Sequence, residues 1–169
     1  MNIYLVGFMA SGKTTLGRQL AELLGMRYID MDEHIELQTG KTIRQIFVTQ
    51  GEEHFRKVEN EILLDLTSQN GLVVATGGGS PCFYNNMEAM NTKGLTIYIK
   101  VSVEALVNRL ADSKVDRPLL WGKSVDELTA YIKEMLRLRE PYYSTAKLVI
   151  TSDEPTAAEI AAAVRPKLN

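Results

Sequence analysis

A glycine-bracketed loop that directly follows a short apolar run constrains this chain more than any other feature. Residues 7–14 match the pattern G-x-x-x-x-G-K-T, and the apolar residues 3–6 precede them. Backbone N–H groups can surround phosphate oxygens only where side chains leave room, which is why glycines bracket such a loop. The helix expected after the loop adds unpaired N–H groups and the positive end of its dipole. The pattern and its context predict a loop that binds the phosphates of a nucleoside triphosphate.

Two side chains of this loop carry the chemistry that a triphosphate requires. Lys13 adds a mobile positive charge for the β- and γ-phosphates, and the Thr14 hydroxyl is placed to ligate Mg²⁺. We predict that the nucleotide contacts the loop residues Ala10, Ser11, Gly12, Lys13, Thr14 and Thr15.

Five short apolar runs, separated by helical patterns, predict βαβ units and a parallel sheet. Strands are expected at residues 3–6, around 28–29, and at 72–75, 95–99 and 148–151. Helices are expected at residues 13–24, from near 32 to 40, from 42 to about 50, after 51, from Ser80-Pro81, after Ser102, at 125–139 with Pro141 beyond it, and after Thr156. The predicted architecture is a three-layer α/β P-loop fold with a central five-stranded parallel sheet.

Two regions do not fit this alternation of strands and helices. Residues 31–60 are helical without a strand, and residues 112–123 are polar and contain Gly122. We interpret residues 31–60 as a substrate-binding insertion and residues 112–123 as a lid. Both belong to one domain of residues 1–169, whose core is then residues 1–30, 61–111 and 124–169.

Length, charge and cysteine content limit the number of domains, the partners and the cellular compartment that we expect for this chain. A chain of 169 residues suits one domain with a full core, and a net charge of −2 gives no reason to expect nucleic acid as a partner. The single cysteine, Cys82, fits a reducing cytosol. No segment approaches the roughly 20 apolar residues of a membrane span. We expect a cytoplasmic protein without a membrane partner, and a monomer, because no predicted helix has a spare apolar face.

Two carboxylates follow the second predicted strand. Asp30 and Asp32 are expected on the same rim of the sheet as the phosphate-binding loop, because ligands bind beyond the carboxyl ends of parallel strands. One carboxylate would hold Mg²⁺ through water, and the other would orient the acceptor hydroxyl and its proton. The alternative is that Asp32 only caps the helix that follows it.

The segment Gly77-Gly78-Gly79 ends the third strand and leaves the backbone bare. A tight turn would need one glycine, so three favour a surface on which a ligand approaches backbone N–H groups.

Three arginines are candidates for binding anionic groups. Arg139 lies near a helix end, a suitable place from which to project a guanidinium at a carboxylate. Arg56 is a similar candidate, although Glu52 and Glu59 lie one turn away on the same helix, so simple ion pairing is the alternative. Arg117 lies in the proposed lid, where closure would bring it over the γ-phosphate.

Together these residues resemble the shikimate kinase family, in the nucleoside-monophosphate-kinase branch of P-loop folds. The resemblance spans almost the whole chain. It is carried by the phosphate-binding loop and by Asp30-x-Asp32-x-x-Ile35-Glu36, Gly51-Glu52-Glu53-His54-Phe55-Arg56, Gly77-Gly78-Gly79, Arg117-Pro118-Leu119-Leu120 and Arg139-x-Pro141-Tyr142.

The resemblance implies ATP-dependent phosphorylation of the 3-hydroxyl of shikimate, with Mg²⁺. It implies that Arg56 and Arg139 bind the shikimate carboxylate, that Asp32 and residues 77–79 bind its hydroxyls, and that Arg117 is the lid arginine. It also implies that Asp30 supports Mg²⁺ through water together with Thr14, that Lys13 contacts the transferred phosphoryl group, and that Arg109 and Pro155 flank the adenine of ATP. Ser152-Asp153-Glu154 departs from the basic or amide side chain that the family often has before Pro155.

Two other functions compete with this prediction. One is a related small-molecule kinase that acts on gluconate or a nucleoside monophosphate. The other is a catalytically silent nucleotide-binding module, which would be expected to lack Lys13, Thr14, Asp30, Asp32 or Arg117, although all five are present.

Overall fold

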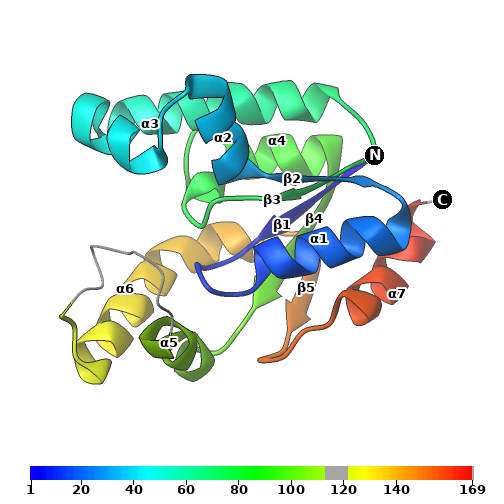
Figure 1. The fold of residues 1–169 in the computed structure, drawn as a ribbon. Coiled ribbons are helices and arrows are strands. Elements are labelled where there is room, and N and C mark those ends of the chain that lie inside the picture. Colours follow the sequence, from blue (N-terminus) through cyan, green and yellow to red (C-terminus); the bar gives the residue numbers. More distant parts are fainter. Residues whose placement is uncertain (113–121, 169) are drawn as a thin grey trace.

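A five-stranded parallel sheet forms the centre of the fold (Figure 1). The computed structural model describes residues 1–112 and 122–168. The strand order is β2-β3-β1-β4-β5 and every neighbouring pair is parallel. The strands are β1 (Asn2–Val6), β2 (Arg27–Asp30), β3 (Leu72–Ala75), β4 (Gly94–Lys100) and β5 (Leu148–Thr151). All five strands predicted from the apolar runs are confirmed, with bounds that differ by at most one residue at either end.

Helices cover both faces of the sheet and complete the predicted three-layer α/β architecture (Figure 1). One face carries α2 (Met31–Thr39), α3 (Ile43–Ser68) and α4 (Asn86–Lys93). The other carries α1 (Lys13–Leu24), α5 (Val103–Asp112), α6 (Val125–Tyr143) and α7 (Ala157–Leu168). In the part of the chain that the structure describes, no helix combines the length and the apolar character needed to span a membrane.

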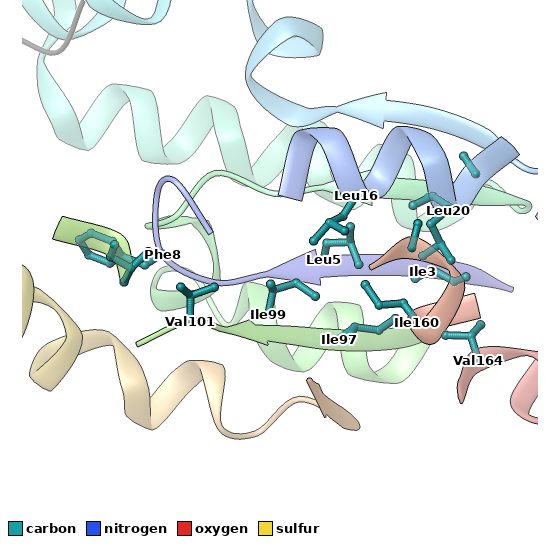
Figure 2. Close-up of a cluster of buried hydrophobic side chains, with 14 of the residues drawn as sticks. Ile3, Leu5, Phe8, Leu16, Leu20, Ile97, Ile99, Val101, Ile160 and Val164 are labelled. Carbon is teal, nitrogen blue, oxygen red and sulfur yellow. The ribbon is translucent and has the colours of Figure 1, made fainter. Parts of the chain in front are cut away.

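Strand alternation divides the buried side chains between two cores. Tyr4 and Val6 of β1 point to one face, whereas Ile3 and Leu5 point to the other, as the two-residue period of a strand requires. Figure 2 shows the second of these clusters, in which side chains of β1 and β4 meet those of α1 and α7: Ile3, Leu5, Ile97, Ile99, Leu16, Leu20, Ile160 and Val164.

Most of the helix starts predicted from capping residues are present. Thr42 and Gln45 form a complete capping box at the start of α3. Ser102 Oγ accepts a hydrogen bond from Ala105 N at 3.2 Å, and Ser124 Oγ accepts one from Glu127 N at 3.1 Å. Gly51 interrupts α3 with a φ of 84°, so the short and the long helix predicted on either side of it are two helical segments joined by a kink.

Two helix predictions are wrong in detail. Ser80-Pro81 starts only η1, a 3₁₀ turn at Ser80–Cys82 without a side-chain cap, and the next α-helix begins at Asn86. The sixth helix does not stop before Pro141 but continues to Tyr143. Proline has no backbone N–H, so the helix loses one hydrogen bond. Tertiary contacts stabilise the last turn, because Tyr143 is fully buried and Glu140 is hydrogen-bonded to β4.

The proposed division of the chain into a core, a substrate-binding insertion and a lid stays a prediction. Residues 31–60 form α2 and the first part of α3. Within the proposed lid, residues 113–121 lie outside the part of the chain that the structure describes.

Candidate active site

A cleft of about 750 Å³ opens where β1, β2 and β3 end. It brings together thirteen of the sixteen residues predicted from the sequence to form the site. These are Ala10, Gly12, Lys13, Thr14, Thr15, Asp30, Asp32, Arg56, Gly77, Gly78, Gly79, Arg109 and Arg139. Ser11 and Pro155 are not among the described residues that line the cleft, and Arg117 lies outside the described part of the chain.

The loop after β1 has the conformation that its glycines predict. Gly7 and Gly12 have φ values of 146° and 97°, which favour glycine. A Cβ on Gly7 would lie 2.8 Å from the carbonyl oxygen of Ile99 in β4, so no side chain fits there. Lys13 Nζ donates hydrogen bonds at 2.8 Å to the carbonyl oxygens of both Gly7 and Phe8. The loop therefore encloses a positive charge at the start of α1, where the helix dipole also favours an anion.

Asp30 connects the loop to the second carboxylate. Its Oδ2 accepts a hydrogen bond from the Thr14 hydroxyl at 3.0 Å, and its Oδ1 accepts hydrogen bonds from Asp32 N at 3.0 Å and Glu33 N at 3.2 Å. The alternative in which Asp32 caps the following helix is therefore wrong, because Asp30 is the N-cap of α2. The side chain of Asp32 lines the cleft instead.

The Thr14 hydroxyl and the Asp30 carboxylate are a donor set that fits Mg²⁺. This ion prefers oxygen ligands, keeps several waters, and is commonly held by one or two carboxylates together with substrate phosphates. The two side chains lie side by side at the entrance of the phosphate-binding loop, where a triphosphate would supply further oxygens.

Asp32 has an altered protonation equilibrium. Burial raises the pKa of the Asp32 carboxyl above its usual range, and the negative charge of Asp30 raises it further, whereas Lys13 opposes the shift. Asp32 nevertheless remains a solvent-exposed residue where it lines the cleft, so water limits the effect of desolvation on its pKa. A group with these properties is suited to orient a hydroxyl and to accept its proton.

A buried ion pair forms part of the wall of the cleft. Arg56 Nη1 lies 2.9 Å from Glu59 Oε1, and the side chains are only 11% and 1% exposed. The Arg56 guanidinium also lies over the ring of Phe83, 4.3 Å from its centroid, and 3.5 Å from Glu52. Arg56 therefore has the ion pairs that its neighbours in the sequence suggested, and it lines the cleft as well.

The three glycines after β3 each leave room for a charged side chain. A Cβ on Gly77 would lie 3.2 Å from Asp32 Oδ1, one on Gly78 would lie 3.2 Å from Arg139 Nη1, and one on Gly79 would lie 2.5 Å from Arg56 Nη2. These are the side chains predicted to bind the acceptor: Asp32, Arg139 and Arg56. The run of glycines is therefore more than a turn, because it lets three functional groups pack against one stretch of bare backbone.

Arg109 links the phosphate-binding loop to the segment before the last helix. Its guanidinium donates a hydrogen bond to the Ala10 carbonyl at 2.9 Å and another to the carbonyl of Asp153. The Asp153 carboxylate in turn accepts hydrogen bonds from Ser102 N at 2.9 Å and Ser102 Oγ at 3.0 Å. At this position, where the sequence departs from the family pattern, the Asp153 carboxylate holds the start of α5.

Sequence reasoning gave no role in the site to two buried side chains that contact it. The sequence suggests Glu59 only as an ion-pair partner for Arg56, yet this side chain lines the cleft. Tyr143 is fully buried, and its hydroxyl donates a hydrogen bond to the carbonyl of Gly78. Helical spacing places Tyr143 one turn beyond Arg139, but nothing in the sequence shows that the two approach residues 77–79.

Comparison with known proteins identifies the family. The family model for shikimate kinase matches residues 9–169. This chain belongs to the shikimate kinase family. The shikimate kinase of Parabacteroides distasonis is 45% identical over 152 residues, which cover 90% of this chain and 88% of that protein. The shikimate kinase of Azobacteroides pseudotrichonymphae is 40% identical over 167 residues, which cover 98% of each chain.

Solved structures of shikimate kinases have the same fold over nearly the whole chain. The enzyme from Bacteroides thetaiotaomicron superposes with a TM-score of 0.92 at 37% identity, covering 99% of this chain and 98% of that one. The Acinetobacter baumannii enzyme, solved in complex with shikimate, gives a TM-score of 0.86 at 39% identity, covering 99% and 92%. A gluconokinase from Sinorhizobium meliloti, at a TM-score of 0.62 and 17% identity, shares the fold alone.

Glu59 is expected to make stability fall as the pH rises toward neutrality. Burial raises the pKa of Glu59 to about 7, although Arg56 opposes the shift, whereas an ordinary glutamate has a pKa near 4.5. Between these values the folded chain holds the extra proton, so the free energy of unfolding decreases as the pH rises through this window. Glu59→Gln should remove this dependence, which amounts to as much as about 3 kcal/mol.

Urea unfolding of both proteins from pH 4.5 to pH 8 measures the effect. Glu53→Gln, at an exposed position on the same helix, is the control and should follow the parent chain. Parallel curves for Glu59→Gln and the parent chain would show that Glu59 has no such titration.

Proposed function

We propose that this chain transfers the γ-phosphoryl group of ATP to the 3-hydroxyl of shikimate, with Mg²⁺, through the residues that line the cleft. One observation carries the proposal: a phosphate-binding loop, a pair of arginines and a carboxylate line a single cleft. Membership of the shikimate kinase family supports the acceptor, as does the related Acinetobacter baumannii enzyme, whose structure contains shikimate.

The charges around the acceptor side match a small ring with a carboxylate at one end and hydroxyls at the other. Arg56 and Arg139 provide guanidinium groups, which pair with carboxylates in a fork geometry. Asp32 and the backbone of residues 77–79 provide an acceptor and donors for hydroxyl groups. In this role the arginines orient the ring, and Asp32 receives or orients the proton of the hydroxyl that attacks the γ-phosphorus.

The residues proposed to bind ATP act by positioning its phosphates and by supplying positive charge. The backbone of residues 10–15 and the ammonium group of Lys13 hold the phosphates and offset negative charge that develops during transfer. Thr14 and Asp30 would hold Mg²⁺, which would supply positive charge to offset the negative charge of the phosphates. Arg109 and Pro155 are proposed for the adenine end. Arg117 is proposed to reach the γ-phosphate from the lid, although it lies outside the described residues.

A substrate panel with coupled detection of ADP tests the proposed reaction. Shikimate should be the preferred acceptor over gluconate and nucleoside monophosphates. Lys13→Met and Asp32→Asn should each lower kcat by about two orders of magnitude or more, since each removes a group used in the transition state. Turnover of gluconate or a nucleoside monophosphate without turnover of shikimate would contradict the proposal, and ATP binding without any turnover would indicate a silent module.

Arg139→Ala should act mainly on the acceptor. We expect the KM for shikimate to rise about 10- to 100-fold with a smaller change in kcat, because carboxylate binding persists from the ground state to the transition state. Arg137→Ala is the matched control, since Arg137 lies on the same helix but pairs with Glu134 at 2.7 Å on an exposed face. An unchanged KM in Arg139→Ala would remove Arg139 from the acceptor site.

Arg117→Lys should have a larger effect on kcat, which it lowers, than on the KM for ATP or the KM for shikimate. Lysine keeps the charge but cannot reproduce the planar fork of donors, so a loss of about tenfold or more in kcat is expected at saturating substrates. Equal kcat values for the two proteins would mean that Arg117 takes no part in the transfer.

We also propose that the chain works as a monomer in the cytoplasm, with only small-molecule partners. A net charge of −2 supports the absence of nucleic acid from this set. Light scattering on the purified protein, with and without ATP and shikimate, would contradict the monomer if it gave a dimer mass.

A further inference from the structure

Gly78 lies at the junction between the two halves of the cleft. A Cβ on Gly78 would lie 3.4 Å from Met9 N in the phosphate-binding loop and 3.2 Å from Arg139 Nη1 on α6. The peptide of Gly78 therefore packs between the group that holds the donor and a group proposed to hold the acceptor. Any movement of this peptide changes its distance from both groups.

Tyr143 holds this peptide from the side away from solvent. Its hydroxyl donates a hydrogen bond to the Gly78 carbonyl, and its side chain is fully buried. Tyr143 follows Arg139 by four residues on α6, so the two side chains lie on the same face of the helix. Helix α6 thus contacts Gly78 at two points, through the Tyr143 hydroxyl and through the Arg139 guanidinium.

The last turn of α6 is itself fixed to the sheet. The Tyr98 hydroxyl donates a hydrogen bond to Glu140 Oε2 at 2.6 Å, and Lys100 Nζ donates one to Glu140 Oε1 at 2.6 Å. The rings of Tyr98 and Tyr143 also pack together, with centroids 5.1 Å apart. Strand β4 therefore sets the position of the turn that carries both Arg139 and Tyr143.

We infer that Tyr143 is a positioning residue for the acceptor, an inference that rests on the proposed function. By holding the Gly78 carbonyl, Tyr143 fixes the peptide that joins Gly78 and Gly79, and so sets the distance between the Gly79 N–H and the Arg139 guanidinium. This distance must match the separation of hydroxyl and carboxylate on the acceptor. Tyr143 thus selects ring acids whose two polar ends have this separation, although it does not itself touch the acceptor.

Tyr143→Phe tests the inference, because it keeps the ring against Tyr98 and removes only the hydroxyl. We expect the KM for shikimate to rise about tenfold, with the KM for ATP within about twofold of the parent value and a smaller change in kcat. The matched control is Tyr142→Phe, at the neighbouring exposed position, which should leave all three constants unchanged. Calorimetric titration with shikimate alone should show the same loss of affinity in Tyr143→Phe.

Several outcomes would overturn the inference. One is a folded Tyr143→Phe protein with an unchanged KM for shikimate. Another is an equal rise in the KM values for shikimate and ATP, which would indicate general loosening of the fold. If Tyr143→Phe does not fold, Gly78→Ala decides, because the added methyl group changes the distance to Arg139 and should raise the KM for shikimate selectively. A parent chain that does not turn over shikimate would overturn both this inference and the proposed function, whereas unchanged variants of an active parent would overturn this inference alone.

Discussion

The parallel alignment of the central strands is the constraint on which the site depends. β1 pairs with β3 on one side and β4 on the other, and β3 also pairs with β2, all in the same direction. The segments that follow β1, β2 and β3 therefore emerge at one rim: the phosphate-binding loop, Asp30 and residues 77–79. A single antiparallel strand in this group would move one of the three segments to the opposite rim and separate donor from acceptor.

Close packing of bare backbone explains how a small cleft holds so many charged groups. Residues 77–79 give space to Asp32, Arg139 and Arg56, and Gly7 lies against the Ile99 carbonyl of β4. Burial of Arg56 would be costly without a partner, and Glu59 supplies one. Desolvation still dominates at Glu59, whose pKa is raised to about 7. The acceptor wall therefore carries a carboxyl that is near its titration point at neutral pH.

Local signals in the sequence predicted the donor half of the site and the strands. The glycines of residues 7–14 require special backbone angles, and the apolar runs have the length of buried strands, so both are encoded locally. The contact between Tyr143 and Gly78 was not predictable, because it joins residues 65 positions apart and leaves no local signal in the sequence. Asp30 and Asp32 were both placed at the cleft, but only the structure shows that Asp30 caps α2. The predicted helix end before Pro141 was wrong for a related reason. The helix continues because contacts of its last turn with β4 outweigh the backbone hydrogen bond that proline removes.

A crystal structure of the protein with ADP, Mg²⁺ and shikimate tests most directly the claim that the two walls of one cleft hold the two substrates. We predict the shikimate carboxylate within hydrogen-bonding distance of Arg56 and Arg139, a ring hydroxyl at Asp32, and the β-phosphate of ADP in the loop of residues 10–15. Shikimate bound elsewhere, or bound in this cleft with its carboxylate turned toward Asp32, would contradict that claim.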